Sequence, residues 1–182
     1  SMSKNKHEQK CHNLTDGGQV VHVKNFIKNP TNLFNELKSN AEWEKFTYKV
    51  YDKKVQSPRL MAIIYFDDTT LTLLDAVRLR VEKVMKLKFK YAVLNYYKDG
   101  NDYISYHADR EVPDGTVVVS ISLGATRRFI LKHKYDKKIK YIFLPENGDL
   151  LVMNDVAIKK MYKHSVPKMA NVGARISVTL RQ

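Results

Sequence analysis

The sequence is poor in cysteine and has no long apolar run. Its 182 residues include one cysteine, Cys11, which excludes an internal disulfide framework and a zinc site built from cysteines. We therefore expect an intracellular protein. No segment approaches the roughly 18 consecutive apolar residues of a membrane span, so we expect no membrane partner.

Acidic residues are also scarce relative to basic ones. The chain has 19 Asp and Glu against 32 Lys and Arg, a formal net charge of +13. Such a charge favours a polyanionic partner. The excess leans toward the C-terminal third, in lysine clusters at residues 132–134, 137–140 and 159–160. Lysines that simply face solvent at hairpin tips are the alternative explanation, and charge alone does not decide between the two.

The chain also lacks internal repeats and any linker rich in proline or glycine. We predict a flexible basic tail over residues 1–18, in which Ser1 and Met2 are an expression scar, and a single domain over 19–182. Apolar residues spaced three and four apart predict helices over 31–39 and 70–87.

Strand patterns begin at residue 91. Six short runs of Val, Ile and aromatic residues, separated by turn signals, predict strands at 91–97, 116–123, 128–134, 140–144, 149–153 and 175–181. Helices followed by many short strands predict an α+β fold. We expect a double-sheet roll or barrel with N-terminal helices packed on one outer face.

One short motif suggests a metal site. His107 and Asp109 are two residues apart, so on an extended segment their side chains project to the same side. With His164 they complete two histidines and one carboxylate, the ligand set of the facial triad that holds Fe(II). The pattern alone is weak, because a chain with six histidines and 19 acidic residues often contains one by chance. His164 in a turn before Pro167 is the structural alternative.

The predicted last strand presents a polar face. Arg175, Ser177, Thr179 and Arg181 alternate with Ile, Val and Leu and therefore share one side of the strand. The two arginines either face water or point into the barrel. Inside a pocket they need a partner, and a dicarboxylate bound by guanidinium groups provides one.

Several motifs then occur in the order of a known family. They lie at residues 95–111, 121–129, 148–153, 164–167 and in the final Arg-x5-Arg. Together they resemble the AlkB family of iron(II)/2-oxoglutarate dioxygenases, over residues 91–181. The resemblance implies a double-stranded β-helix, or jelly-roll, core over about 91–182.

The resemblance also implies roles for the residues of the site. His107, Asp109 and His164 would bind Fe(II), with O2 and 2-oxoglutarate as co-substrates. The 2-oxoglutarate would contact Asn95, Tyr97, Arg175, Ser177, Thr179 and Arg181. Ser177 replaces the asparagine that is usual in the family, and packing in the core remains an alternative for Tyr97.

The implied activity is oxidative demethylation of N-alkylated bases, such as 1-methyladenine and 3-methylcytosine, with release of formaldehyde, succinate and CO2. A monomeric DNA-repair enzyme is expected, nuclear in a eukaryote. The alternatives are an oxygenase that acts on RNA or protein, and a basic binding module without catalysis.

Substrate contacts are expected from a nucleotide-recognition lid over about 47–69 and from the residues that follow the metal motif. In the lid, Tyr51 would enter the base stack and Tyr65 or Phe66 would stack on the base, unless these three aromatics pack in the core. The other candidate substrate contacts are Lys53, Arg59, Arg110 and Glu111. The lid is shorter than in duplex-repair members, and Arg110 replaces an acid, so the preferred strand and lesion stay open.

Overall fold

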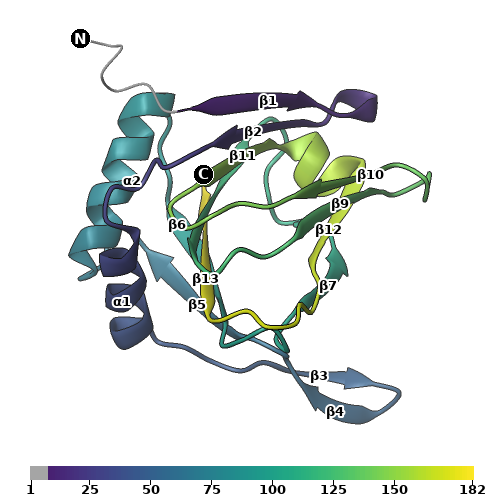
Figure 1. Cartoon of the computed structure of the whole chain (residues 1–182), viewed down its shortest axis with the longest axis horizontal. Helices are drawn as coiled ribbons and strands as arrows, with labels where there is room; N and C mark the ends of the chain where they lie inside the picture. Colours follow the sequence, from purple (N-terminus) through teal and green to yellow (C-terminus); the bar gives the residue numbers. More distant parts are fainter. Residues whose placement is uncertain (1–7) are drawn as a thin grey trace.

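The computed structural model describes residues 8–182, which form two facing β-sheets with two helices outside one of them (Figure 1). The larger sheet, here the major sheet, has seven strands. In spatial order they are β1 (Gln9–Asn13), β2 (Gln19–Val23), β11 (Leu150–Asn154), β8 (Val117–Gly124), β13 (Arg175–Arg181), β6 (Tyr91–Tyr97) and β5 (Leu60–Tyr65).

The minor sheet faces the major sheet and has four antiparallel strands. In spatial order they are β10 (Lys140–Phe143), β9 (Phe129–His133), β12 (Tyr162–Val166) and β7 (Ile104–His107). A core between the sheets joins Val118 and Leu151 of the major sheet to Phe129 and Leu131 of the minor sheet. This arrangement confirms the predicted jelly-roll core.

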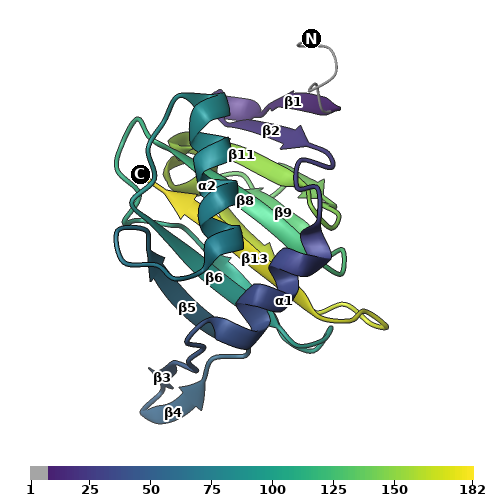
Figure 2. The same ribbon diagram turned by 90° about the vertical axis from the view of Figure 1, so that its left-hand side faces the viewer.

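Two helices, α1 (Pro30–Asn40) and α2 (Thr72–Met85), cover the outer face of the major sheet (Figure 2). Their apolar faces form a second core with that sheet, which includes Leu33, Leu37, Leu74, Val81, Leu94, Ile121 and Val178. The helices are joined by a polar contact, since the Glu36 carboxylate accepts hydrogen bonds from the backbone N–H groups of Leu73 (3.0 Å) and Leu74 (3.1 Å).

Three short elements complete the fold. A two-stranded hairpin of β3 (Thr47–Val50) and β4 (Lys53–Gln56) projects away from both sheets (Figure 1). A 3-10 turn, η2 (Thr15–Gly17), joins β1 to β2, and a π-helical turn, η3 (Val156–Lys160), joins β11 to β12. Among the described residues, no helix is long and apolar enough to cross a membrane.

One boundary predicted from the sequence is wrong. From residue 8 onward the expected tail is structured: β1 pairs with β2 over its whole length, and Asp16 contacts His133 at 2.8 Å. Residues 1–7 lie outside the described part of the chain. Within the expected lid over 47–69, β5 pairs with β6 in the major sheet and the β3–β4 hairpin stands apart from both large sheets.

Candidate active site

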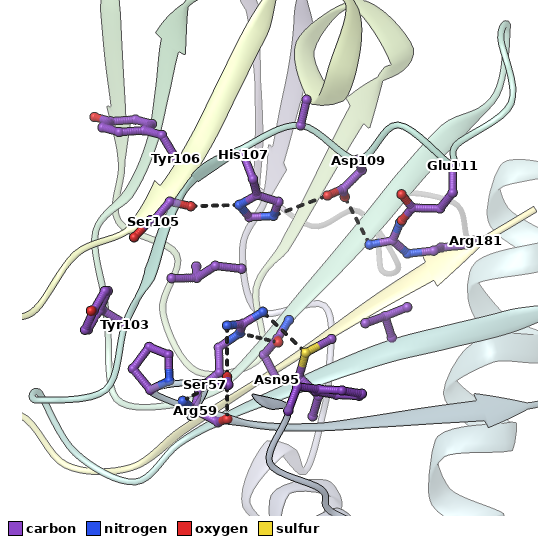
Figure 3. Close-up of a pocket in the computed structure, with 16 residues that line it drawn as sticks. Ser57, Arg59, Asn95, Tyr103, Ser105, Tyr106, His107, Asp109, Glu111 and Arg181 are labelled. Carbon is purple, nitrogen blue, oxygen red and sulfur yellow. Dashed lines mark hydrogen bonds and ion pairs between the residues drawn. The ribbon is translucent and has the colours of Figure 1, made fainter. Parts of the chain in front are cut away.

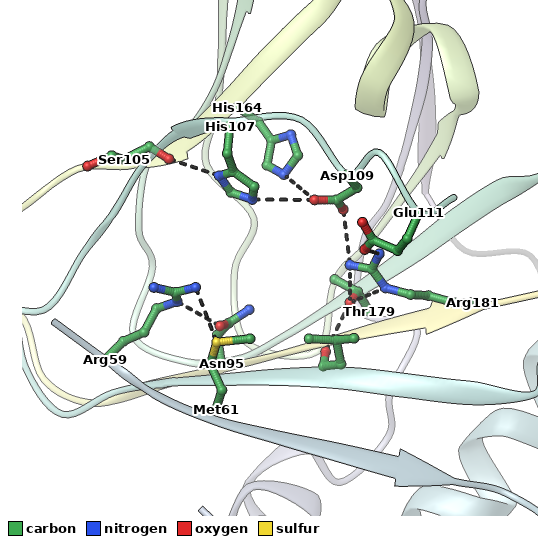
Figure 4. A network of polar contacts seen from close by, with 11 residues as sticks. Arg59, Met61, Asn95, Ser105, His107, Asp109, Glu111, His164, Thr179 and Arg181 are labelled. Atoms are coloured by element: carbon green, nitrogen blue, oxygen red, sulfur yellow. Dashed lines mark hydrogen bonds and ion pairs between the residues drawn. The ribbon is translucent and has the colours of Figure 1, made fainter. Parts of the chain in front are cut away.

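The three predicted metal ligands meet at the edge of the minor sheet (Figure 4). His107 on β7 and His164 on β12 are direct cross-strand partners. Asp109 follows β7, where its backbone N–H donates to the Ile158 carbonyl of η3 (3.1 Å). The Nε2 atom of each histidine lies 3.3 Å from Asp109 Oδ1. The atoms available for coordination lie within 4.8 Å of one another, which suits one metal ion.

Burial and charge hold these residues in metal-binding forms. Burial lowers the pKa of His164, which favours the neutral imidazole even beside Asp109. Burial opposes ionisation of Asp109, but its contacts with His107 and His164 and the charge of Arg181 outweigh this and lower its pKa. His107 donates through Nδ1 to the Ser105 carbonyl (2.8 Å), which leaves Nε2 for a metal. His164 Nδ1 is buried and has no hydrogen-bond partner among the described residues.

A buried cation lies behind the metal cluster. Arg175 of β13 is 1% exposed, and its Nη2 donates to Ser122 Oγ (3.0 Å). Its Nε and Nη1 atoms have no partner within residues 8–182, and burial lowers the pKa of this guanidinium. The side chain shares an inner cavity with Asn95, Tyr97, Ser177, Thr179 and Arg181. Free donors on a buried cation fit a carboxylate group, so these residues suit the 2-oxoglutarate expected from the sequence.

Arg181 joins the inner cavity to the metal cluster. Its Nη2 donates to Asp109 Oδ2 (3.0 Å) and to Thr179 Oγ1 (3.1 Å), and its Nη1 donates to Glu111. Thr179 in turn donates to the Val93 carbonyl (2.9 Å). The second arginine of the Arg-x5-Arg motif is therefore positioned by β13 and already paired with acidic side chains.

A larger pocket of about 490 Å³ opens on the other side of His107 (Figure 3). Arg59 lines it, and its Nε donates to Asn95 Oδ1 (2.7 Å), so the lid contacts a predicted 2-oxoglutarate residue. Glu111 also lines this pocket. Arg110 is exposed beside Asp109.

The β3–β4 hairpin carries two further candidates outside the pocket lining. Tyr51 lies at its turn with a positive φ of 50° and is 96% exposed. Lys53 begins β4 and is also exposed. Tyr51 therefore does not pack in the core, and its side chain faces solvent at the hairpin tip.

The stacking platform expected at Tyr65 or Phe66 is not supported. Both residues lie at the end of β5 away from the pocket, where Tyr65 packs 5.9 Å from the Tyr91 ring and Phe66 packs against the helical core. The aromatic residues that line the pocket are Phe46, Tyr103 and Tyr106. Tyr103 and Ser105 precede His107 at two-residue steps, a spacing that places side chains on one side of an extended segment, so the sequence does carry a signal for Tyr103.

Arg127 was also missed as a candidate. It is fully buried and donates to the carbonyls of Asp99 (3.1 Å), Asp102 (2.7 Å) and Pro167 (2.8 Å), which ties two loops together. Its guanidinium lies 5.3 Å from the Tyr97 ring. Nothing in the sequence distinguishes this arginine from the next residue, Arg128.

Comparisons with known proteins agree with this geometry. The family model described as the 2OG-Fe(II) oxygenase superfamily matches residues 65–181. DNA oxidative demethylase ALKBH2 from Homo sapiens is 34% identical over 82% of this chain and 67% of its own length. The Bos taurus protein of the same name is 32% identical over 82% of this chain and 63% of its length. The Arabidopsis thaliana protein of the same name is 26% identical over 98% of this chain and 71% of its own length.

The chain thus spans 63% to 71% of the lengths of these relatives. The solved structure of OsALKBH1 shares the fold, with a TM-score of 0.65 at 16% identity over 90% of this chain and 97% of that one. Sequence match, fold and site geometry agree, and the chain belongs to the 2OG-Fe(II) oxygenase superfamily and, within it, to the AlkB family of iron(II)/2-oxoglutarate dioxygenases.

Proposed function

We propose that this protein demethylates N-alkylated bases in nucleic acid, with 1-methyladenine and 3-methylcytosine in DNA as substrates. The observation that carries the proposal is the position of the His107–Asp109–His164 cluster. It lies between an inner cavity that holds the buried Arg175 and an outer pocket of about 490 Å³. The cluster therefore reaches a small dicarboxylate on one side and a larger molecule on the other.

The roles of individual residues follow from this arrangement. His107, Asp109 and His164 would hold Fe(II), while Arg175, Asn95 and Tyr97 would hold 2-oxoglutarate. When bound, Fe(II), 2-oxoglutarate and O2 would supply the oxidising chemistry that hydroxylates an N-methyl carbon; 2-oxoglutarate would be converted to succinate and CO2, and the hydroxymethyl product would break down to formaldehyde and the restored base. His107 is the ligand most open to the outer pocket, so the methylated base would enter from that side.

The proposed substrate is supported by the charge around the pocket. A base inside a duplex cannot reach a recessed metal, so it must be flipped out or already unpaired. The β3–β4 hairpin beside the pocket presents exposed lysines at 49, 53 and 54 and the exposed Tyr51. Lysines neutralise phosphates without reading sequence, which favours a nucleic acid over a protein substrate.

Two further proposals concern the state of the protein. The ligand cluster and the pocket are complete within one chain, which supports a monomeric enzyme. A DNA substrate makes the nucleus its site of action in a eukaryotic cell.

The decisive experiment is product analysis on methylated substrates. Single-stranded DNA, duplex DNA and RNA with 1-methyladenine or 3-methylcytosine, and a methylated peptide, are incubated with Fe(II), 2-oxoglutarate and O2. We expect formaldehyde and succinate from methylated DNA, and neither product from His107→Ala. The matched control is His12→Ala on β1, which lies outside the site and should keep activity. Formaldehyde from the peptide alone would contradict the proposed substrate, and normal activity of His107→Ala would contradict the metal assignment.

A further inference from the structure

Three lysines stand side by side across the minor sheet. Lys140 on β10 pairs with Lys132 on β9, and Lys132 pairs with Lys163 on β12. Their neighbours Leu131 and His164 point into the molecule, so strand alternation places Lys132 and Lys163 on the outer face. We call Lys140, Lys132 and Lys163 the lysine ladder.

The ladder is electrostatically unfavourable in the protein alone. Directly opposite residues in a sheet have Cβ atoms about 4.5–5.5 Å apart, and like charges at these positions destabilise the pairing. The ion pairs that involve residues 8–182 include none from Lys132, Lys140 or Lys163. A bound polyanion would therefore reduce repulsion that no acidic side chain of the described residues offsets.

The ladder leads directly to the outer pocket. The ammonium group of Lys132 lies 4.0 Å from the ring centre of Tyr106, and Tyr106 lines the pocket. A second pair is adjacent, since Lys168 lies 5.2 Å from the ring centre of Tyr103, which also lines the pocket. Figure 3 shows Tyr103 and Tyr106 on the side of the pocket away from Glu111 and Arg181. Aromatic faces and positive charges thus continue from the pocket onto the sheet.

Other cations raise the positive potential near the Lys163 end of the ladder. Burial lowers the pKa of Lys134, and the positive charges of Arg110, Lys163 and Lys159 lower it further. Of these cations, Lys159 is paired, with Asp114 at 2.6 Å. Both α-helices pack on the major sheet, so no α-helix of the described chain covers this face (Figure 1).

We propose that the lysine ladder, together with Tyr103 and Tyr106, binds an unpaired nucleic-acid strand that leads into the outer pocket. The proposal rests on the function proposed above and adds the form of the substrate. Phosphates would contact the lysines, and unpaired bases would stack on the tyrosine rings, a combination that binds single strands with little sequence preference. In a duplex the bases are already stacked on one another, so none is available to stack on the tyrosine rings.

The test compares two variants with equal loss of charge. Lys132→Gln, Lys140→Gln and Lys163→Gln are combined in one variant. The control combines Lys38→Gln, Lys83→Gln and Lys88→Gln, three exposed lysines in and beside the helices. Binding of fluorescent 12-residue oligothymidylate and oligouridylate to the Mn(II)- and 2-oxoglutarate-loaded protein is measured by anisotropy across a salt series.

For the ladder variant we expect the slope of log affinity against log salt to fall by about 2, since each phosphate contact to a single strand contributes about 0.7. The control should keep its slope. A separate Tyr106→Leu variant should lose about tenfold in affinity from lost stacking and keep its slope. Equal effects on DNA and RNA would show that the ladder reads the shared phosphate backbone, and an effect on one alone would identify the substrate strand.

Two results would overturn the proposal. One is an unchanged salt slope in the ladder variant. The other is an equal loss of affinity for a 12-base-pair duplex, which would make the face a general polyanion surface. Demethylation by the unaltered protein is scored separately. If it releases no formaldehyde while the ladder variant still loses its slope, the proposed reaction fails and the binding site stands.

Discussion

Arg175 carries a full charge into the centre of the molecule without an acidic partner. Two of its three guanidinium nitrogens lack any hydrogen-bond partner in the described chain. Such a group costs stability in the free protein and regains that cost when an anion binds. The inner cavity is thus arranged for its ligand at the expense of the ligand-free fold.

Replacing Arg175 should therefore have opposite effects on stability and on the use of 2-oxoglutarate. Arg175→Met should raise the free energy of unfolding of the ligand-free protein, by about 1–4 kcal/mol, because an apolar side chain replaces a buried unpaired charge. The same change should raise the KM for 2-oxoglutarate at least 30-fold, the effect of about 2 kcal/mol lost from a buried charge pair. Urea unfolding and steady-state kinetics check the two parts. A less stable variant with an unchanged KM would show that Arg175 serves only the fold.

At the same scale, the sequence could predict that His107, Asp109 and His164 lie together, but it could not predict the pocket walls. His107 and Asp109 have a spacing that geometry links to a common ion, and His164 lies in a motif of the family. Tyr65 and Phe66 do not line the pocket, because their positions depend on the length of β5 and on its pairing with β6, which the sequence does not give. The role of Arg127 cannot be predicted from the sequence, because its three acceptors are backbone carbonyls from loops distant in the chain.

At the scale of elements, strands rich in Val, Ile and aromatic residues after residue 91 were predictable, and strands with polar sequences were not. The predicted runs at 91–97 and 175–181 match β6 and β13. In contrast, β12 was missed because it buries His164 and Ser165 next to each other and so breaks the apolar alternation. At the edge of the major sheet, β1 has mostly exposed polar residues and no pattern that separates it from a tail.

One polar side chain links the two helices in addition to their shared apolar core. Glu36 of α1 accepts hydrogen bonds from two backbone N–H groups at the start of α2. The N-cap residue of α2 itself makes no side-chain hydrogen bond to these groups. We expect Glu36→Ala to lower the free energy of unfolding by about 1–2 kcal/mol, the cost of losing an N-cap. Glu42→Ala, at an exposed position after α1, is the control and should change little. Equal denaturation midpoints for both variants would refute the bridging role.

A second element-scale prediction concerns pH. Asp155 precedes η3, accepts the Gly115 N–H (2.7 Å) and contacts Lys160 (3.1 Å), and the Gly115 bond above all lowers its pKa. Because the pKa of Asp155 is lower in the folded protein, its ionised form stabilises the fold at pH values above the ordinary Asp pKa of about 3.9. This stabilisation is lost as the pH falls through the pKa of the folded state. Asp155→Asn should therefore destabilise the protein at pH 7, with a difference that shrinks below about pH 4.

Denaturation midpoints across the pH range check this prediction. Asp67→Asn, an exposed carboxyl after β5, is the control and should show no such pH dependence. A constant difference between Asp155→Asn and the unaltered protein at every pH would contradict the charge-based explanation.

At the scale of the whole molecule, the cofactors should act as stabilisers. The proposed metal ligands come from β7, the segment after it and β12, and the proposed 2-oxoglutarate residues come from β6 and β13, so bound ligands would join both sheets. A ligand at 100 times its Kd adds about 2.7 kcal/mol, which corresponds to about 5–10 °C in Tm at this chain length. We expect Mn(II) with 2-oxoglutarate to produce such a shift, and EDTA to reverse it.

The Arg175→Met variant separates the two contributions to this shift. It should keep the increase in Tm from Mn(II) alone and lose the further increase from 2-oxoglutarate. Differential scanning calorimetry under anaerobic conditions provides the measurement. A full 2-oxoglutarate increment in the variant would place the dicarboxylate elsewhere.

The cross-strand pairing of His107 with His164 also makes the metal a sensor of correct assembly. Successive side chains on a strand point to opposite faces, so a slip of one residue between β7 and β12 would turn one histidine to the outside. A chain folded with that error would keep nearly all its backbone pairing yet bind no iron. The metal content of a purified sample would therefore count the molecules in which β7 and β12 have paired in the right register.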